Sequence, residues 1–160
     1  LKKAAELSNW GKVANGRFQG MSYSDFLNTY QVQVAEVSIS SRGMIKVHSV
    51  TCVADCGQVF NPHIARQQLE GGILYGLTAA LKGEISVKNG QIMQSNFDDY
   101  PMLKLKDTPE IRVHLMENHE PPGGLGEAGT PLIGPAVSNA VFSCTGKRVR
   151  RLPIRRKDLT

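Results

Sequence analysis

A glutamate set among small residues is the side chain whose type and place best suit proton transfer. Glu127 lies between Gly126 and Ala128, directly ahead of a stretch with helical spacing, so no bulky neighbour hinders its carboxylate. Such a carboxylate can act as a general base, and free N–H groups at the helix start can help to hold an anionic cofactor. The alternative, which the spacing alone favours, is that Glu127 complements the helix dipole, an effect of about 0.3–1 kcal/mol.

Two adjacent glutamines form a second candidate. Gln67 and Gln68 stand just before the run Glu70-Gly71-Gly72. A primary amide both donates and accepts hydrogen bonds, which suits a planar heterocyclic ligand. The alternative, again favoured by the spacing alone, is a polar helix face exposed to solvent.

Other kinds of site find little support. Cys52, Cys56 and Cys144 are an odd number without metal-ligand spacing, and we interpret them as small apolar fillers. The four histidines show no ligand spacing either. The chain contains no Gly-Lys-Ser or Gly-Lys-Thr phosphate loop and no serine in a Gly-x-Ser-x-Gly elbow, so nucleotide hydrolases and serine hydrolases are not indicated.

The strands that must position these residues can be found by their alternating apolar residues. This pattern predicts a hairpin of strands over 30–39 and 44–53, with a bulge near Glu36, and another strand over 110–116. The Asn-Gly pair at 89–90 predicts a second, smaller hairpin. We interpret residues 10–20 as a connector.

Helical spacing predicts two longer helices, over about 62–82 and 131–145. Asn61 and Pro62 suit the start of the first helix, and Gly146 suits the end of the second. The first helix contains Gly71, Gly72 and Gly76. Each costs roughly 0.5–1 kcal/mol relative to alanine, which indicates the close approach of another backbone or a ligand. We expect an α+β fold with both helices packed on a mixed, mostly antiparallel sheet.

Length and composition indicate a single packed domain over 1–160. With 41% hydrophobic and 21% charged residues the chain is near the globular average, which excludes a disordered or disulfide-dense protein. The net charge of +5 reflects 19 Lys and Arg against 14 Asp and Glu, and seven of the basic residues lie between 147 and 157. We therefore interpret 147–160 as a basic tail, and we expect no nucleic acid as a partner.

No stretch is suited to span a membrane. The chain opens at Leu1 without a methionine, which suggests a piece of a longer polypeptide. The compartment, bacterial cytoplasm or periplasm, is therefore left open by the sequence.

Three segments, in this order along the chain, carry a family resemblance. They are Ala54-Asp55-Cys56-Gly57-Gln58-Val59-Phe60-Asn61-Pro62, Gln68-Leu69-Glu70-Gly71-Gly72-Ile73-Leu74-Tyr75-Gly76-Leu77 and Pro121-Pro122-Gly123-Gly124-Leu125-Gly126-Glu127. Together they resemble the C-terminal part of the molybdenum-binding subunit of the xanthine oxidase family. The resemblance is closest to the isoquinoline 1-oxidoreductase β-subunit branch, whose members include aldehyde oxidases and dehydrogenases.

This resemblance implies a hydroxylase that carries a molybdopterin cytosine dinucleotide and inserts a water-derived oxygen into an N-heterocycle or aldehyde. In the family, the glutamate of the Gly-x-Gly-Glu segment, here Glu127, is the general base. Gln68 matches a glutamine that lies near the molybdenum. The backbone amides of Gly124, Leu125 and Gly126 would lie against the cofactor.

The same resemblance sets expectations for the parent protein. The family pairs this subunit with an iron–sulfur subunit and sometimes a cytochrome. The family's molybdenum subunit is several times longer than this chain, so we expect the 160 residues alone to be inactive and to hold no cofactor. Many members have proline where this chain has Ala128. The alternative is a non-catalytic binding or assembly domain that keeps the scaffold.

Overall fold

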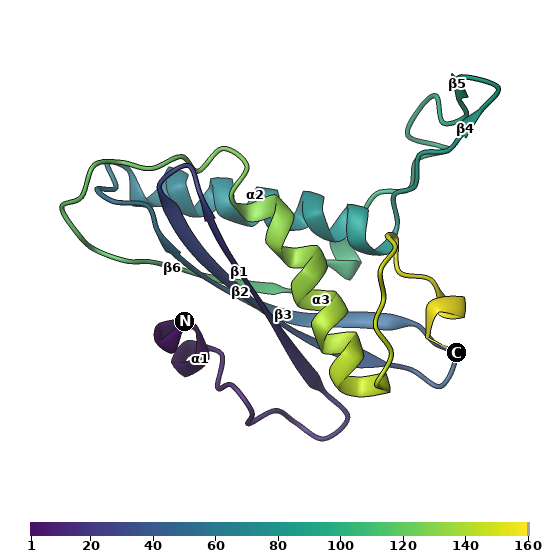
Figure 1. Ribbon diagram of the computed structural model, residues 1–160, viewed down its shortest axis with the longest axis horizontal. Coiled ribbons are helices and arrows are strands. Elements are labelled where there is room, and N and C mark those ends of the chain that lie inside the picture. The colour runs from purple at the N-terminus through teal and green to yellow at the C-terminus, as the bar shows by residue number, and fades with distance from the viewer. Residues whose placement is uncertain (160) are drawn as a thin grey trace.

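A four-stranded sheet with two helices on one face forms the centre of the molecule, in a computed structural model that describes residues 1–159 (Figure 1). In spatial order the strands are β1 (Phe18–Phe26), β2 (Thr29–Ile39), β3 (Ile45–Asp55) and β6 (Glu110–Leu115). The helices are α2 (Pro62–Leu81) and α3 (Gly129–Thr145). The short elements are α1 (Lys2–Leu7), β4 (Val87–Lys88), β5 (Gln91–Ile92) and 3-10 turns at Leu105–Asp107 and Arg156–Asp158. The α+β prediction is confirmed.

The central hairpin forms where the alternating residues predict it. β2 and β3 pair antiparallel, and their register shifts between Glu36 and Val37, at the predicted bulge. The predicted connector over 10–20 is wrong at its end, because β1 begins at Phe18. This strand is rich in polar residues, and it packs closely under α3 at Gly20. A Cβ at that glycine would lie 2.1 Å from the backbone nitrogen of Ala140. The missing side chain therefore permits the contact between strand and helix.

β6 brings a part of the chain that is distant in sequence next to β3. β6 pairs parallel to β3, from Ser49 opposite Glu110 to Ala54 opposite Leu115. The carboxyl ends of both strands therefore meet at one edge, and the segments that follow them run side by side.

Local signals set the ends of both helices. Asn61 Oδ1 accepts hydrogen bonds from the backbone N–H groups of His63 and Ile64, both at 3.1 Å, with Pro62 in the first turn. α3 begins at Gly129, two residues before the predicted start, and ends at Gly146 with a φ of 71°.

Two of the three glycines in α2 permit close packing against α3. A Cβ at Gly76 would lie 2.4 Å from both the carbonyl oxygen of Thr130 and Cγ2 of Ile133. A Cβ at Gly72 would lie 3.1 Å from Cα of Gly129. A Cβ at Gly71, by contrast, would have no neighbour within 4 Å. Helix packing therefore accounts for Gly72 and Gly76 but not for Gly71.

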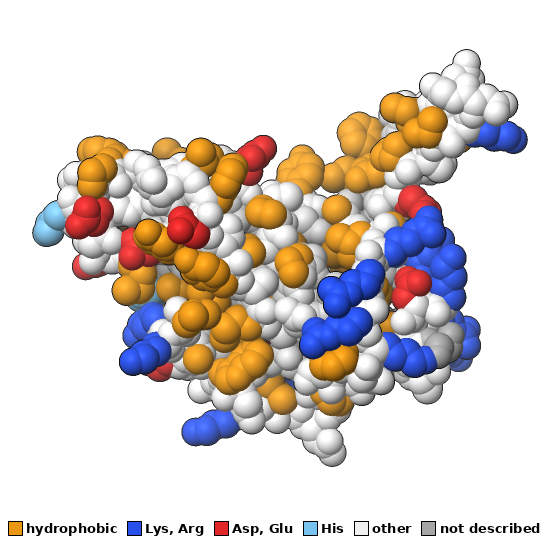
Figure 2. Space-filling model, in the orientation of Figure 1, with side chains coloured by type: hydrophobic (Ala, Val, Ile, Leu, Met, Phe, Trp, Pro, Cys, Tyr) orange, Lys and Arg blue, Asp and Glu red, His pale blue; other side chains and the backbone are white. Residues whose placement is uncertain are grey.

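The basic C-terminal segment packs back on the two helices. Ile154 is buried, and its N–H donates to the carbonyl oxygen of Ala80 at 2.8 Å. The guanidinium of Arg148 stacks over the ring of Phe142 at 3.5 Å, and Arg155 pairs with Glu84. Figure 2 shows Lys and Arg side chains gathered over this part of the surface.

Candidate functional site

The glycine-rich loop ahead of α3 lies at the end of the sheet where the carboxyl ends of β3 and β6 meet. The chain after β6 runs beside the chain after β3, because the N–H of Gln58 donates to Glu120 O at 2.9 Å and that of Gly123 donates to Cys56 O at 2.8 Å. Gly57 has a φ of 70°, and a Cβ there would overlap Pro121 O at 2.2 Å. These backbone contacts deliver residues 124–128 to the N-terminal half of α2.

The predicted glutamine and the predicted loop meet directly. Gln68 Nε2 donates to the carbonyl oxygen of Gly126 at 2.6 Å, across 58 positions of sequence. Gln68 and the neighbouring Glu127 are both exposed. The carboxylate of Glu127 makes no hydrogen bond or ion pair with any residue in 1–159. The structure thus brings the two side chains to one open surface, with the carboxylate unengaged.

The backbone amides of the loop differ in their availability. The N–H of Gly124 donates to Leu27 O at 2.8 Å, so it is engaged within the chain. The N–H groups of Leu125 and Gly126 have no hydrogen-bond partner in the described part of the chain. Two adjacent donors therefore remain for a bound group beside Glu127.

Two glycines at this surface have room for a side chain. A Cβ at Gly126 or at Gly71 would meet nothing within 4 Å, and neither residue has a positive φ. Gly71 is three residues after Gln68, so both lie on one face of α2. Neither packing nor backbone conformation requires glycine at these positions. An approaching ligand would account for both.

Sequence reasoning did not single out three buried polar residues beneath the loop. Thr29, Gln31 and Gln33 of β2 are at most 1% exposed. Polar residues of an alternating strand usually face solvent, but this row faces α2 and α3. Thr29 Oγ1 donates to Gly124 O at 2.8 Å, and Gln33 Nε2 donates to Gly129 O at 2.8 Å. The alternation of glutamine with valine over 31–34 was the available signal.

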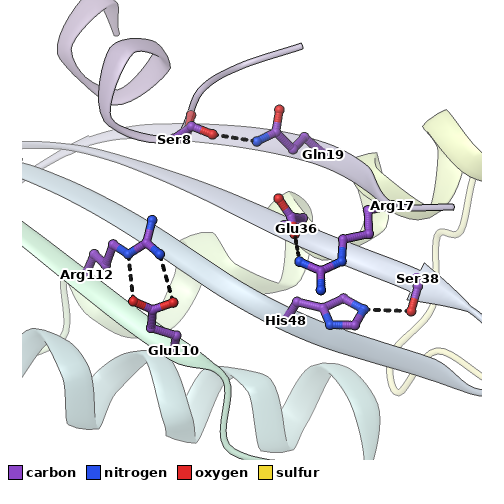
Figure 3. Close-up of polar contacts among 8 residues, drawn as sticks. All are labelled: Ser8, Arg17, Gln19, Glu36, Ser38, His48, Glu110 and Arg112. Carbon is purple, nitrogen blue, oxygen red and sulfur yellow. Dashed lines mark hydrogen bonds and ion pairs between the residues drawn. The ribbon is translucent and has the colours of Figure 1, made fainter. Parts of the chain in front are cut away.

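The opposite face of the sheet carries polar side chains that satisfy one another. Arg17 pairs with Glu36 at 2.5 Å, and Arg112 pairs with Glu110 at 2.8 Å. Figure 3 shows both pairs. His48 Nε2 and Ser38 Oγ are 2.7 Å apart. Burial, followed by the charges of Arg17 and Lys46, lowers the pKa of His48. These side chains are therefore engaged with one another, unlike the carboxylate of Glu127.

The cysteines, histidines and carboxylates of residues 1–159 form no metal site, and one cavity lies apart from the glycine-rich loop. Cys52 and Cys56 are buried, Cys144 is half-buried, and burial raises the pKa of Cys52 to about 12. No group of three or more His, Cys, Asp or Glu within residues 1–159 is placed to hold a metal ion. A cavity of about 710 Å³ lies between the C-terminal half of α2 and the start of β3, away from the glycine-rich loop. Over the same residues, no helix is long and apolar enough to cross a membrane.

Comparison with known proteins shows the family to which the chain belongs. The family described as "Molybdopterin cofactor-binding domain" matches residues 2–109. The chain is 37% identical over 160 residues to isoquinoline 1-oxidoreductase subunit beta of Brevundimonas diminuta, covering 97% of this chain and 20% of that protein. It is 32% identical over 166 residues to the membrane-bound aldehyde dehydrogenase (pyrroloquinoline-quinone) of Gluconacetobacter polyoxogenes, covering 99% of this chain and 22% of that protein.

A solved structure supports the same relationship. Quinoline 2-oxidoreductase from Pseudomonas putida 86 superimposes with a TM-score of 0.72 at 26% identity, over 81% of this chain and 18% of that one. The chain thus spans about a fifth of the length of each of these proteins.

Proposed function

Because the chain belongs to the family of molybdopterin cofactor-binding domains, within the xanthine oxidase family, we propose that it is the C-terminal part of a molybdenum hydroxylase large subunit. Its relatives are molybdenum-dependent oxidoreductases, and their names include isoquinoline, quinoline and aldehyde as substrates. The substrate class that follows is an N-heterocycle or an aldehyde, oxidised with oxygen derived from water.

The residues present suit one edge of a molybdenum cofactor. Gly71 and Gly126 leave open space beside Gln68, and the N–H groups of Leu125 and Gly126 are free to donate to an anionic group. We assign Gln68, Gly124, Leu125 and Gly126 to cofactor binding. Gly124 contributes indirectly, because its N–H donates to Leu27 O and so holds the loop in place. A molybdopterin cytosine dinucleotide is the form that we propose.

Glu127 is the general base of the proposed reaction. When bound, the cofactor supplies the two-electron acceptor and the water-derived oxygen that the substrate gains. The Glu127 carboxylate would accept the proton of that oxygen as it attacks the substrate carbon. Gln68 fixes the peptide directly before Glu127 by donating to Gly126 O, so it orients the base as well as lining the cofactor edge.

The observation that carries this proposal is the hydrogen bond between Gln68 and Gly126. It joins two segments that are far apart in sequence, and it places the unengaged carboxylate beside free amide donors and open glycines. In the parent protein we propose an iron–sulfur subunit as the partner that removes electrons, with a cytochrome as a further carrier in some assemblies.

The test is a single substitution in the full-length parent, expressed with its partner subunit. Glu127→Gln keeps the size of the side chain but removes the base, so turnover should fall by about 100-fold or more while molybdenum content stays at the wild-type level. Glu117→Gln, an exposed glutamate on the same segment, is the matched control and should retain turnover. Unchanged turnover in Glu127→Gln would reject the base, whereas a wild-type parent that binds molybdenum but has no turnover would favour the non-catalytic binding or assembly domain.

A further inference from the structure

The polar row of β2 changes character where it passes beneath the glycine-rich loop. The buried side chains of β2 that face the helices are, in order, Thr29, Gln31, Gln33, Ala35 and Val37. The last two pack in the core against the helices. The first three are polar although they are as deeply buried as the apolar pair. The switch to polar residues therefore coincides with the position of the loop.

Burial of these glutamines is costly to the fold. The Oε1 atoms of Gln31 and Gln33 are buried and have no hydrogen-bond partner within residues 1–159. An unsatisfied buried polar atom destabilises a protein, and a long apolar side chain would fill the same space without that cost. Packing alone therefore does not account for glutamine at these positions.

Three side-chain donors hold three carbonyls on either side of Glu127. Thr29 Oγ1 donates to Gly124 O at 2.8 Å, and Gln33 Nε2 donates to Gly129 O at 2.8 Å. Gln68 Nε2, on α2, donates to Gly126 O at 2.6 Å. The held carbonyls thus belong to residues three before, one before and two after the glutamate. Contacts on both sides of a residue restrict its backbone far more than a contact on one side.

We propose that Thr29 and Gln33 are positioning residues that hold the loop from beneath and thereby set the place of the Glu127 carboxylate. The inference rests on the proposed function of Glu127. Gln31 is not part of this set, because its Nε2 donates to Cys52 Sγ at 3.0 Å instead of to the loop. A row of three buried polar residues thus contains two that contact the loop and one internal control.

The experiment uses the full-length parent with its partner and four variants. Gln33→Met and Thr29→Val remove a donor with little change in side-chain size. Gln31→Met makes the same change as Gln33→Met at the control position, and Thr29→Ser restores the hydroxyl. The first readout is hydrogen–deuterium exchange of a peptide covering residues 123–131, which requires no turnover. The second is the split between kcat and KM.

Gln33→Met and Thr29→Val should each speed exchange of the hydrogen-bonded amides of Gly124 and Thr130 by roughly 10-fold and lower kcat by about 10- to 100-fold, with molybdenum content and KM near wild type. Gln31→Met and Thr29→Ser should leave exchange and kcat within about twofold of wild type. Equal exchange in Gln33→Met and Gln31→Met would overturn the inference, as would a failure of Thr29→Ser to restore the rate lost in Thr29→Val.

The two proposals can fail separately. If Glu127→Gln keeps its turnover, the base assignment fails, yet the exchange measurement still tests whether Thr29 and Gln33 hold the loop. If Glu127→Gln is inactive and loop exchange is unchanged in Gln33→Met and Thr29→Val, the base stands and the positioning role is rejected.

Discussion

Replacing Gly71 with alanine should stabilise the fold, whereas the same replacement at Gly76 should destabilise it. Both glycines lie inside α2, so each alanine gains about 0.5–1 kcal/mol of helix propensity. The surroundings differ. A Cβ at Gly71 has no neighbour within 4 Å, but a Cβ at Gly76 would lie 2.4 Å from Thr130 O. That oxygen belongs to the backbone of α3, so the new methyl group must push the two helices apart.

By these magnitudes the free energy of unfolding is higher than wild type in Gly71→Ala and lower than wild type in Gly76→Ala. Overpacking a close contact typically costs about 1–3 kcal/mol, which exceeds the gain in propensity over most of that range. With a urea m-value of about 2 kcal/mol/M, Gly71→Ala should raise the unfolding midpoint by about 0.3–0.5 M. Gly76→Ala should lower it, by up to about 1.3 M.

The same two variants distinguish an effect on stability from an effect on the proposed cofactor site. In the full-length parent, Gly71→Ala should lower molybdenum content although it stabilises the domain, because its methyl group fills space beside Gln68 that we assign to the cofactor. Urea denaturation of the 160-residue chain measures the effect on stability, and metal analysis of the full-length parent measures the effect on the cofactor. A lower midpoint for Gly71→Ala would refute the packing argument. A raised midpoint with full molybdenum loading would refute the assignment of that space.

Two further predictions concern pH and metal content. The pKa of His48 is lowered in the folded state, so below about pH 6.5 the unfolded chain binds more protons and stability should fall as pH falls. Urea midpoints between pH 5 and 7.5 should show a shallower decline in His48→Gln, and an identical slope would contradict this reasoning. The purified 160-residue chain should contain no molybdenum, since it spans about a fifth of its relatives; stoichiometric metal by mass spectrometry would contradict that expectation.

Local signals account for most of the elements. Alternation of apolar residues predicts the hairpin of β2 and β3, and Asn61 with Pro62 predicts the start of α2, because these preferences depend on neighbours in sequence. β1 escaped prediction for the same reason. Its polar residues carry no local strand signal, and its stability comes from pairing with β2 and from the approach of α3 at Gly20.

The sequence by itself determined the identity of the candidate groups, since Gln68 and Glu127 belong to motifs that can be read from short segments. Only the tertiary structure decided that Gln68 contacts the peptide directly before Glu127, because the parallel pairing of β3 with β6 carries the loop back to α2. It also decided that Gln33 lies beneath that loop, 96 positions from its partner Gly129. Which face of a strand is buried, and against what, depends on long-range packing that no local pattern specifies.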